Sequence, residues 1–246
     1  MIFFSLFLNH MINIKNLEKR YDDPILKGIN VTFAENNVSI IVGVNGSGKS
    51  TLFDCIVGLK KFSGTIWIDN FESGSYAYKS KLFYLPSDFY LPEFMTGREY
   101  VSFVLKQYAS SDSWQVDTLY EIYGMAEKSH ALIETYSFGM KKKIQLIAAI
   151  ALKTDYLLAD EIFSGLDFET TLLTQEIFKQ MSKDTGIVLV THSKTILERF
   201  SEHVFLMSDG KLEKYADDII NLEETIKEME VVNDKRRLIK AYFNTT

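Results

Sequence analysis

Residues 43–50 read GVNGSGKS; the apolar stretch VSIIV precedes them at 38–42, and LFDCIVGLK follows at 52–60. They match the pattern G-x-x-x-x-G-K-[ST] between a buried strand and an amphipathic helix. Glycine permits backbone angles that are closed to other residues, so successive N–H groups can turn towards an anion. A helix that begins near Lys49 would add the positive end of its dipole. The stretch 43–51, hereafter the phosphate loop, is therefore predicted to bind a chain of phosphates, with a flexible turn as the plainer alternative.

Two side chains of the phosphate loop have predicted roles of their own. Lys49 would supply a mobile cation for the terminal phosphates, and Ser50 would offer a hydroxyl to Mg²⁺. The other candidate phosphate-binding residues are Gly43, Asn45, Gly46, Ser47, Gly48 and Thr51.

The stretch YLLADE at 156–161 is an apolar strand that ends in two carboxylates. Neighbouring side chains of a strand point to opposite faces, so Asp160 and Glu161 need not share a task. Asp160 is placed to hold Mg²⁺, and Glu161 could orient or deprotonate an attacking water. An acidic helix cap or a solvated strand end is the alternative, and the presence of a phosphate loop makes it the less favoured one.

Composition indicates an ordinary globular protein of 246 residues, with 46% hydrophobic residues and three prolines. The net charge of −6 gives no electrostatic reason to expect a nucleic-acid partner, although a local basic patch could still provide one. Cys55 has no second cysteine to pair with, which fits a reducing compartment. The opening MIFFSLFLNH is shorter than the ~20 apolar residues of a membrane span and lacks a signal cleavage site. We expect a soluble chain whose translation starts at Met11.

Secondary-structure patterns predict an α/β fold. Short buried-strand candidates at 38–42, 156–160, 187–191 and 203–207, three of them continuous apolar or β-branched runs, alternate with helical stretches, which favours a mostly parallel sheet covered on both faces. Partly alternating stretches at 12–21, 29–36 and 64–71 predict a small antiparallel sheet. From about 86 to 150 the pattern is helical, with a capping box formed by Thr96 and Glu99. Residues 212–246 are predicted to form one or two surface helices.

The two motifs, with what separates and follows them, resemble the ATP-binding cassette of ABC transporters over nearly all of residues 11–215. The resemblance implies ATP and Mg²⁺ as cofactors, and a P-loop NTPase core with an N-terminal antiparallel β subdomain. It also implies a helical subdomain inserted at about 86–150. Residues 1–10 would then be an apolar N-terminal tail, and 216–246 a C-terminal helical extension.

The stretch YSFGMKKK at 136–143, hereafter the signature segment, stands where the family has LSGGQ. Ser137 and Gly139 keep their places, whereas Tyr136, Phe138 and Met140 do not. The resemblance makes this a helix N-terminus that points at the γ-phosphate bound by a second cassette, in a homodimer or a heterodimer. YSxGM looks like the variant of drug- and peptide-exporting relatives, including bacteriocin and lantibiotic exporters. A simple serine-capped helix is the alternative.

Three further positions carry roles that the resemblance implies. Tyr21 would stack on adenine, with a half-buried strand tyrosine as the alternative. Asp167, in the sequence SGLD, would help to couple the two nucleotide sites. His192 would hydrogen-bond the γ-phosphate and position Glu161 or the water.

One departure lies in YLPSDFYLPEF, residues 84–94, where the family has a glutamine that touches Mg²⁺ or water and senses the membrane partner. Ser87 is too short for that role, although Asp88 could contribute an oxygen to the metal. The aromatics Phe89, Tyr90 and Phe94 either line a groove for a partner's short helix or belong to the local core.

The resemblance implies an ATPase subunit that powers a separate transmembrane permease, with export of a peptide, an antibiotic or a related compound as the expected transport. The subunit would be cytoplasmic and held at the inner face of the membrane through the permease, without nucleic acid. One alternative is a regulatory subunit that binds ATP with little hydrolysis. Another is a soluble ABC-type ATPase of DNA repair or translation, but such relatives tend to carry coiled-coil arms or two fused cassettes.

Overall fold

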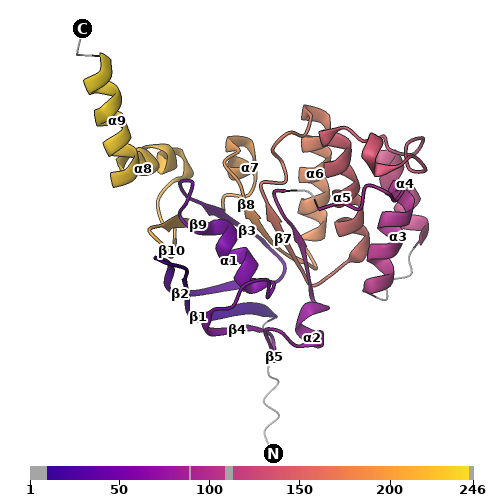
Figure 1. Cartoon of the computed structure of the whole chain (residues 1–246), viewed down its shortest axis with the longest axis horizontal. Helices are drawn as coiled ribbons and strands as arrows, with labels where there is room; N and C mark the ends of the chain where they lie inside the picture. Colours follow the sequence, from indigo (N-terminus) through magenta and orange to yellow (C-terminus); the bar gives the residue numbers. More distant parts are fainter. Residues whose placement is uncertain (1–9, 89, 109–112, 244–246) are drawn as a thin grey trace, which may run out of the picture.

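The computed structural model describes residues 10–88, 90–108 and 113–243, and its strands form two sheets (Figure 1). The smaller sheet is antiparallel, as the alternating patterns predict. In it Ile12 pairs with Phe33 on one side and with Ile68 on the other, and all three are buried. Its strand order is β2 (Pro24–Ala34), β1 (Met11–Arg20), β4 (Ser63–Ile68) and β5 (Phe71–Glu72).

The larger sheet is parallel except at one edge. Every residue of β3, β7 and β8 is buried, as continuous apolar runs require when helices or another sheet cover both faces. Its strand order is β10 (Lys211–Lys214), β9 (His203–Ser208), β3 (Val38–Val42), β8 (Gly186–Val190), β7 (Tyr156–Asp160) and β6 (Leu82–Leu85).

The prediction of helix from residue 212 is wrong at its beginning, because 211–214 form the antiparallel edge strand β10. The cause is a turn between β9 and β10, where Asp209 and Gly210 both have positive φ, 45° and 73°. An Asp-Gly pair in this conformation closes a two-residue hairpin whose twist matches the flanking strands.

Helices lie on both sides of the parallel sheet (Figure 1). The capping box of Thr96 and Glu99 is confirmed at the start of α3. The helices are α1 (Lys49–Ile56), α2 (Tyr76–Lys79), α3 (Gly97–Gln107), α4 (Ser113–Ile122), α5 (Phe138–Leu152), α6 (Phe168–Met181), α7 (Lys194–Arg199), α8 (Leu222–Glu228) and α9 (Glu230–Phe243), with short 3-10 turns η1 (Ile133–Thr135) and η2 (Ile219–Asn221).

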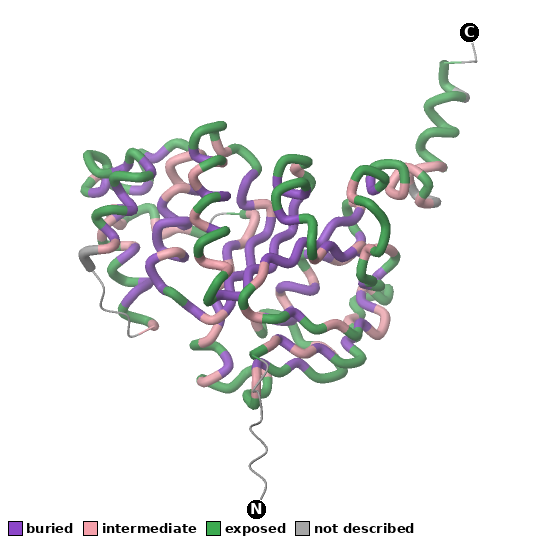
Figure 2. Tube along the Cα trace, turned by 180° about the vertical axis from the view of Figure 1, so that it is seen from behind, coloured by how far each residue is buried: buried purple, intermediate pink, exposed green. Residues whose placement is uncertain are grey.

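Two buried apolar clusters sandwich the parallel sheet, and the buried strands lie at the centre of the molecule (Figure 2). Neighbouring residues of β3 divide between them: Ile40 belongs to the cluster that includes α3, α4 and α5, and Ile41 to the one with α1 and the antiparallel sheet. Helix α9 projects away from this body with Leu238 and Tyr242 exposed (Figures 1 and 2). No helix in the described part of the chain has both the length and the apolarity to cross a bilayer.

The parallel order brings the segments that follow β3, β7 and β8 to the same end of the sheet. Strands β3, β8 and β7 are consecutive neighbours, so their carboxyl ends lie side by side. The chain leaves β3 into the phosphate loop, β7 into Glu161 and β8 towards His192. Ligands of open α/β sheets bind at this edge.

Candidate active site

The phosphate loop has a backbone that only glycine can provide at two positions. A Cβ on Gly43 would lie 2.2 Å from the backbone oxygen of Met207 on β9, closer than atoms can approach. Gly48 caps α1 with φ 108°, in the left-handed region that L side chains rarely adopt. The loop therefore passes tightly over the sheet edge and turns directly into the N-terminus of α1.

Lys49 lies folded against the loop that precedes it. Its side chain is buried, and Nζ donates hydrogen bonds to the carbonyl oxygens of Gly43 at 2.7 Å and Val44 at 3.0 Å. Burial lowers the pKa of Lys49, against the opposing effect of the Glu161 and Asp160 carboxylates. A cation thus sits at the centre of the loop, where an anionic ligand would relieve the cost of its burial.

Ser50 and Asp160 meet although 110 residues separate them in the chain: Ser50 Oγ donates to Asp160 Oδ2 at 2.6 Å. Asp160 is buried; burial raises the pKa of its carboxyl, while the Ser50 hydrogen bond and Lys49 lower it. A hydroxyl and a carboxylate are oxygen ligands that suit Mg²⁺, which keeps its remaining positions for waters and phosphates. The nearby Ser47 Oγ is buried without a hydrogen-bond partner among the described atoms, so the loop still has a group to satisfy. The residues present fit a magnesium–phosphate complex.

Glu161 has an unusual backbone for a residue other than glycine, with φ 50°. Its N–H donates to the carbonyl of Val190 on β8 at 2.9 Å, which ties it to the neighbouring strand. Its Oε1 lies 3.4 Å from His192 Nε2, within ion-pair range but long for a hydrogen bond. Burial raises the pKa of the Glu161 carboxyl, and the Asp160 carboxylate raises it further. A raised pKa strengthens a carboxylate as a proton acceptor.

His192 is poised as a neutral imidazole. Burial lowers its pKa from an ordinary value of 6.5, and the Lys49 ammonium lowers it further. A neutral ring has one N–H donor, which His192 can give either to the Glu161 carboxylate or to a phosphate oxygen.

These groups line one open cavity of about 420 Å³. The predicted residues in its lining are Tyr21, Asn45, Gly46, Gly48, Lys49, Ser50, Thr51, Asp160, Glu161 and His192. Gly43 and Ser47 belong to the loop that forms its floor. Ile25, Ser87 and Val190 also line it, and the sequence analysis predicted no nucleotide contact for them.

Tyr21 lies just beyond the end of β1 and is 52% exposed, so the half-buried strand tyrosine does not describe it. The ammonium of Lys19 lies 4.7 Å from its ring centre. Its ring forms part of the cavity wall and is open to solvent, as a stacking surface for a planar base must be.

Residues 87–94 divide between the cavity and the surface. Ser87 lines the cavity, whereas Asp88 is exposed and is not among the lining residues. Tyr90 and Phe94 are 87% and 78% exposed, so neither belongs to the local core. Phe89 lies outside the described residues.

The signature segment and Asp167 lie elsewhere and satisfy their polar groups locally. Ser137 caps α5 by accepting from the Met140 N–H at 3.3 Å, and Asp167 caps α6 by accepting from the Thr170 N–H at 2.7 Å. Ser137 is exposed. Ser137, Gly139 and Asp167 are all absent from the lining of the phosphate-loop cavity.

Lys142 is a buried neighbour of Glu161 that the sequence analysis did not single out. Its Nζ donates to the Glu161 carbonyl at 2.8 Å. The run KKK at 141–143 offers no signal for this contact. Only the helical phase, fixed by the fold, turns the middle lysine inward while Lys141 and Lys143 remain partly exposed.

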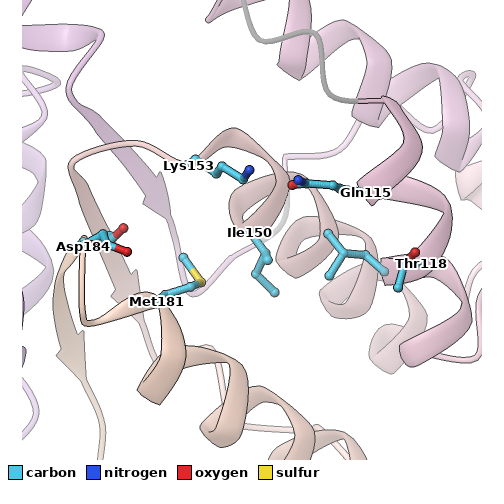
Figure 3. A pocket seen from close by; sticks show the side chains of 8 residues that line it. Gln115, Thr118, Ile150, Lys153, Met181 and Asp184 are labelled. Carbon is cyan, nitrogen blue, oxygen red and sulfur yellow. The ribbon is translucent and has the colours of Figure 1, made fainter.

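A second cavity, about 460 Å³, lies between α4, the end of α5 and the connection from α6 to β8 (Figure 3). Gln115 and Thr118 approach it from α4, Ile150 from α5, and Met181 and Asp184 from the third wall. It shares no lining residue with the phosphate-loop cavity.

The fold and the site define a P-loop ATPase, and comparisons with known proteins give its family. A sequence model of the ABC transporter family matches residues 26–164. The polysialic acid transport ATP-binding protein KpsT of Escherichia coli is 30% identical over 212 residues, covering 82% of this chain and 92% of KpsT. The methionine import ATP-binding protein MetN of Clostridioides difficile is 29% identical over 220 residues, covering 84% and 68%.

A solved structure described as the ATP-binding subunit of an ABC transporter superposes with a TM-score of 0.80, at 23% identity and covering 93% of this chain and 99% of that one. The chain belongs to the ABC transporter family, as an ATP-binding subunit whose ATP hydrolysis is coupled to transport. The relatives named here serve both polysialic acid transport and methionine import, so they do not single out the drug- and peptide-exporting branch.

Proposed function

We propose that this chain hydrolyses Mg·ATP as one half of a head-to-tail pair of cassettes and thereby drives a separate transmembrane permease. The observation that carries the proposal is the convergence of Lys49, the Ser50–Asp160 pair, Glu161 and His192 on one cavity, while Ser137 and Gly139 lie outside it. Residues 11–215 would be the catalytic unit, with the helical subdomain at about 86–150 and the extension at 216–246 attached to it.

Each group in the cavity would have a distinct task. The N–H groups of the phosphate loop and the Lys49 ammonium would bind the phosphate chain, and Tyr21 would stack on adenine. Ser50 and Asp160 would hold Mg²⁺, which neutralises charge on the phosphate oxygens when it is bound. Glu161 would accept a proton from the attacking water, and His192 would hold the carboxylate and contact the γ-phosphate. Asp88 is exposed outside the cavity lining, but its carboxylate raises the pKa of Asp160, so it would contribute an oxygen only at the outer side of the metal.

A second cassette, identical or related, would complete the site. The exposed N-terminus of α5 has the polarity to bind the γ-phosphate held by the other subunit, and Asp167 would couple the two sites. The γ-phosphate would hold the subunits together, and its removal would take away the contact that favours the closed pair. The permease would convert this opening and closing into transport.

For the direction of transport we propose export, of a peptide, an antibiotic or a related compound. The support is the signature segment, whose YSFGM resembles exporter cassettes. The subunit would lie at the inner face of the membrane through its permease. A neighbouring reading frame or a copurifying multi-span protein would identify that permease and with it the direction.

A phosphate-release assay tests the proposal against the regulatory alternative. The full-length chain should release phosphate from Mg·ATP, and turnover should rise when the permease is present. A regulatory subunit would bind ATP but show negligible turnover both alone and in the complex. That second result would refute the proposal for this chain while leaving its family membership intact.

A further inference from the structure

Lys142 places a cation deep in the protein, directly behind the residue proposed as the base. It lies on α5 and is 1% exposed. Its Nζ donates to the carbonyl oxygen of Glu161 at 2.8 Å and lies 3.4 Å from that of Ile162. The ring of Phe138, one turn earlier on α5, lies 5.4 Å from the same nitrogen.

A buried ammonium is costly, because it gives up its hydration shell, and a neutral side chain at the same place would avoid that cost. Burial lowers the pKa of Lys142, whereas the carboxylates of Glu161, Asp160 and Asp88 favour its charged form. Glu161 therefore favours the ammonium of Lys142 in two ways, through its carboxylate and through its carbonyl oxygen.

The backbone at Glu161 needs to be held. A φ of 50° is unfavourable for glutamate, and such a conformation persists only where the surroundings over-determine it. Three hydrogen bonds fix the backbone of Glu161. Its N–H donates to the Val190 carbonyl, and its own carbonyl accepts from the Ser164 N–H at 3.1 Å and from Lys142 Nζ. Relaxation of φ to the ordinary negative range would swing the carboxylate away from His192, because the side chain turns with the backbone.

We propose that Lys142 is a positioning residue for ATP hydrolysis, which holds the Glu161 and Ile162 carbonyls so that the Glu161 carboxylate stays beside His192. The inference rests on the proposed role of Glu161 as the base. Lys142 also lies on α5, which Ser137 caps. It therefore links the signature segment, proposed to contact a second cassette, to Glu161 in this chain's own site.

Substitution of Lys142 by methionine and by glutamine tests the proposal in the full-length chain. Lys142→Met keeps most of the side-chain length but removes every donor; Lys142→Gln keeps an N–H donor on a shorter, neutral side chain. We expect kcat to fall about 10–100-fold in Lys142→Met and about 3–10-fold in Lys142→Gln, because a charge-assisted hydrogen bond is lost or weakened. The dissociation constant of Mg·ATP should stay within about threefold, since Lys142 does not line the cavity. Lys179→Met, at an exposed lysine in the last turn of α6, should leave kcat unchanged.

The kcat-against-affinity split distinguishes positioning from a merely structural role. Wild-type kcat in either variant, equal losses in both, or a loss of ATP affinity that matches the loss of kcat would overturn the proposal. If Lys142→Met does not fold, the Lys142→Gln result decides alone. Glu161→Gln, measured in parallel, separates the base role of Glu161 from the positioning role of Lys142. Full turnover in Glu161→Gln would refute the base role. An inactive Glu161→Gln together with a fully active Lys142→Met would refute only the positioning role.

Discussion

The phosphate loop and the signature segment both resemble nucleotide-binding motifs, but their surroundings in the fold differ. The phosphate loop lies against three strand ends, and Asp160, Glu161 and His192 lie around it although they are distant in the sequence. The signature segment starts a helix whose first turn is capped by its own Ser137 and faces solvent. The phosphate loop thus belongs to a cavity formed within one chain, whereas the signature segment exposes the N-terminus of α5 to solvent.

The difference indicates how the catalytic work is divided. The groups proposed to bind phosphate, hold a metal and accept a proton all line one cavity, so a single chain would bind Mg·ATP. A helix N-terminus that faces outward presents the positive end of its dipole to an anion held by another molecule. On this account, lesions in the cavity should affect binding or chemistry, and lesions in the signature segment should affect assembly.

The largest expected effect is that of Glu161→Gln. Loss of the proton acceptor should lower kcat by about 10²–10⁴-fold, while the affinity for Mg·ATP stays close to that of the wild type. Phosphate release measures the first quantity, and titration with a fluorescent nucleotide measures the second. Full activity in this variant would remove Glu161 from the chemistry.

Lys49→Ala should act on binding rather than on chemistry alone. The ammonium at the centre of the phosphate loop would make charged hydrogen bonds to phosphate, and their loss should weaken ATP binding about 10–100-fold. Calorimetric titration of the purified chain with Mg·ATP measures the change. Lys60→Ala, on the exposed loop after α1, is the matched control and should bind as the wild type does. Unchanged affinity in Lys49→Ala would contradict the assignment of the loop.

Gly139→Asp should separate the signature segment from the cavity. The first side-chain atom fits, because a Cβ at this position would approach only the Gly165 carbonyl, at 3.8 Å. The added carboxylate would repel the partner's γ-phosphate, so turnover should fall about 10-fold or more while ATP affinity of the single chain is unchanged. Equal turnover in the variant and the wild type would argue that the segment is only a capped helix.

The smallest effect is expected at the opposite edge of the sheet, where Lys81 bonds Asp69 at 3.0 Å and also Asp155. Burial raises the pKa of Asp69, but the hydrogen bonds from Lys81 and His10 outweigh it, so the folded pKa lies below the ordinary 3.8. A carboxyl whose pKa is lower in the folded than in the unfolded chain stabilises the fold at pH values above its unfolded-state pKa. This stabilisation is lost as the pH falls through the folded-state pKa. Lys81→Met should therefore cost about 1–2 kcal/mol at pH 7, and the difference should shrink below about pH 4.

Urea unfolding at several pH values measures this loss, and the turnover per folded molecule should not change. A cost that stays constant down to pH 2 would show that packing, rather than the ion pair, sets the contribution of Lys81.

Sequence patterns predicted most of the fold and the cavity because both depend on local signals. The buried runs at 38–42 and 156–160 are strands at the predicted residues, and their parallel order puts the ends of β3 and β7 on the side of the sheet where Ser50 meets Asp160. Edge strand β10 was missed because KLEK is short and charged, and only the Asp-Gly turn before it signals a hairpin.

The rest depends on the packed fold and had no local signal. Inward orientation of Lys142 depends on how α5 packs against the sheet, and the left-handed φ of Glu161 is imposed by its hydrogen bonds to Val190 and Ser164. The exposure of Asp88 follows from the path of its loop. Each of these is a tertiary effect, which residue spacing does not encode.

If a second cassette completes the ATP site, Glu161→Gln should form a dimer in excess Mg·ATP, and light scattering measures the mass. We expect twice the monomer mass with Mg·ATP, the monomer mass without it, and the monomer mass again in the double variant Glu161→Gln, Gly139→Asp. Single chains under every condition, even together with the permease, would contradict the completion of the site by a second cassette.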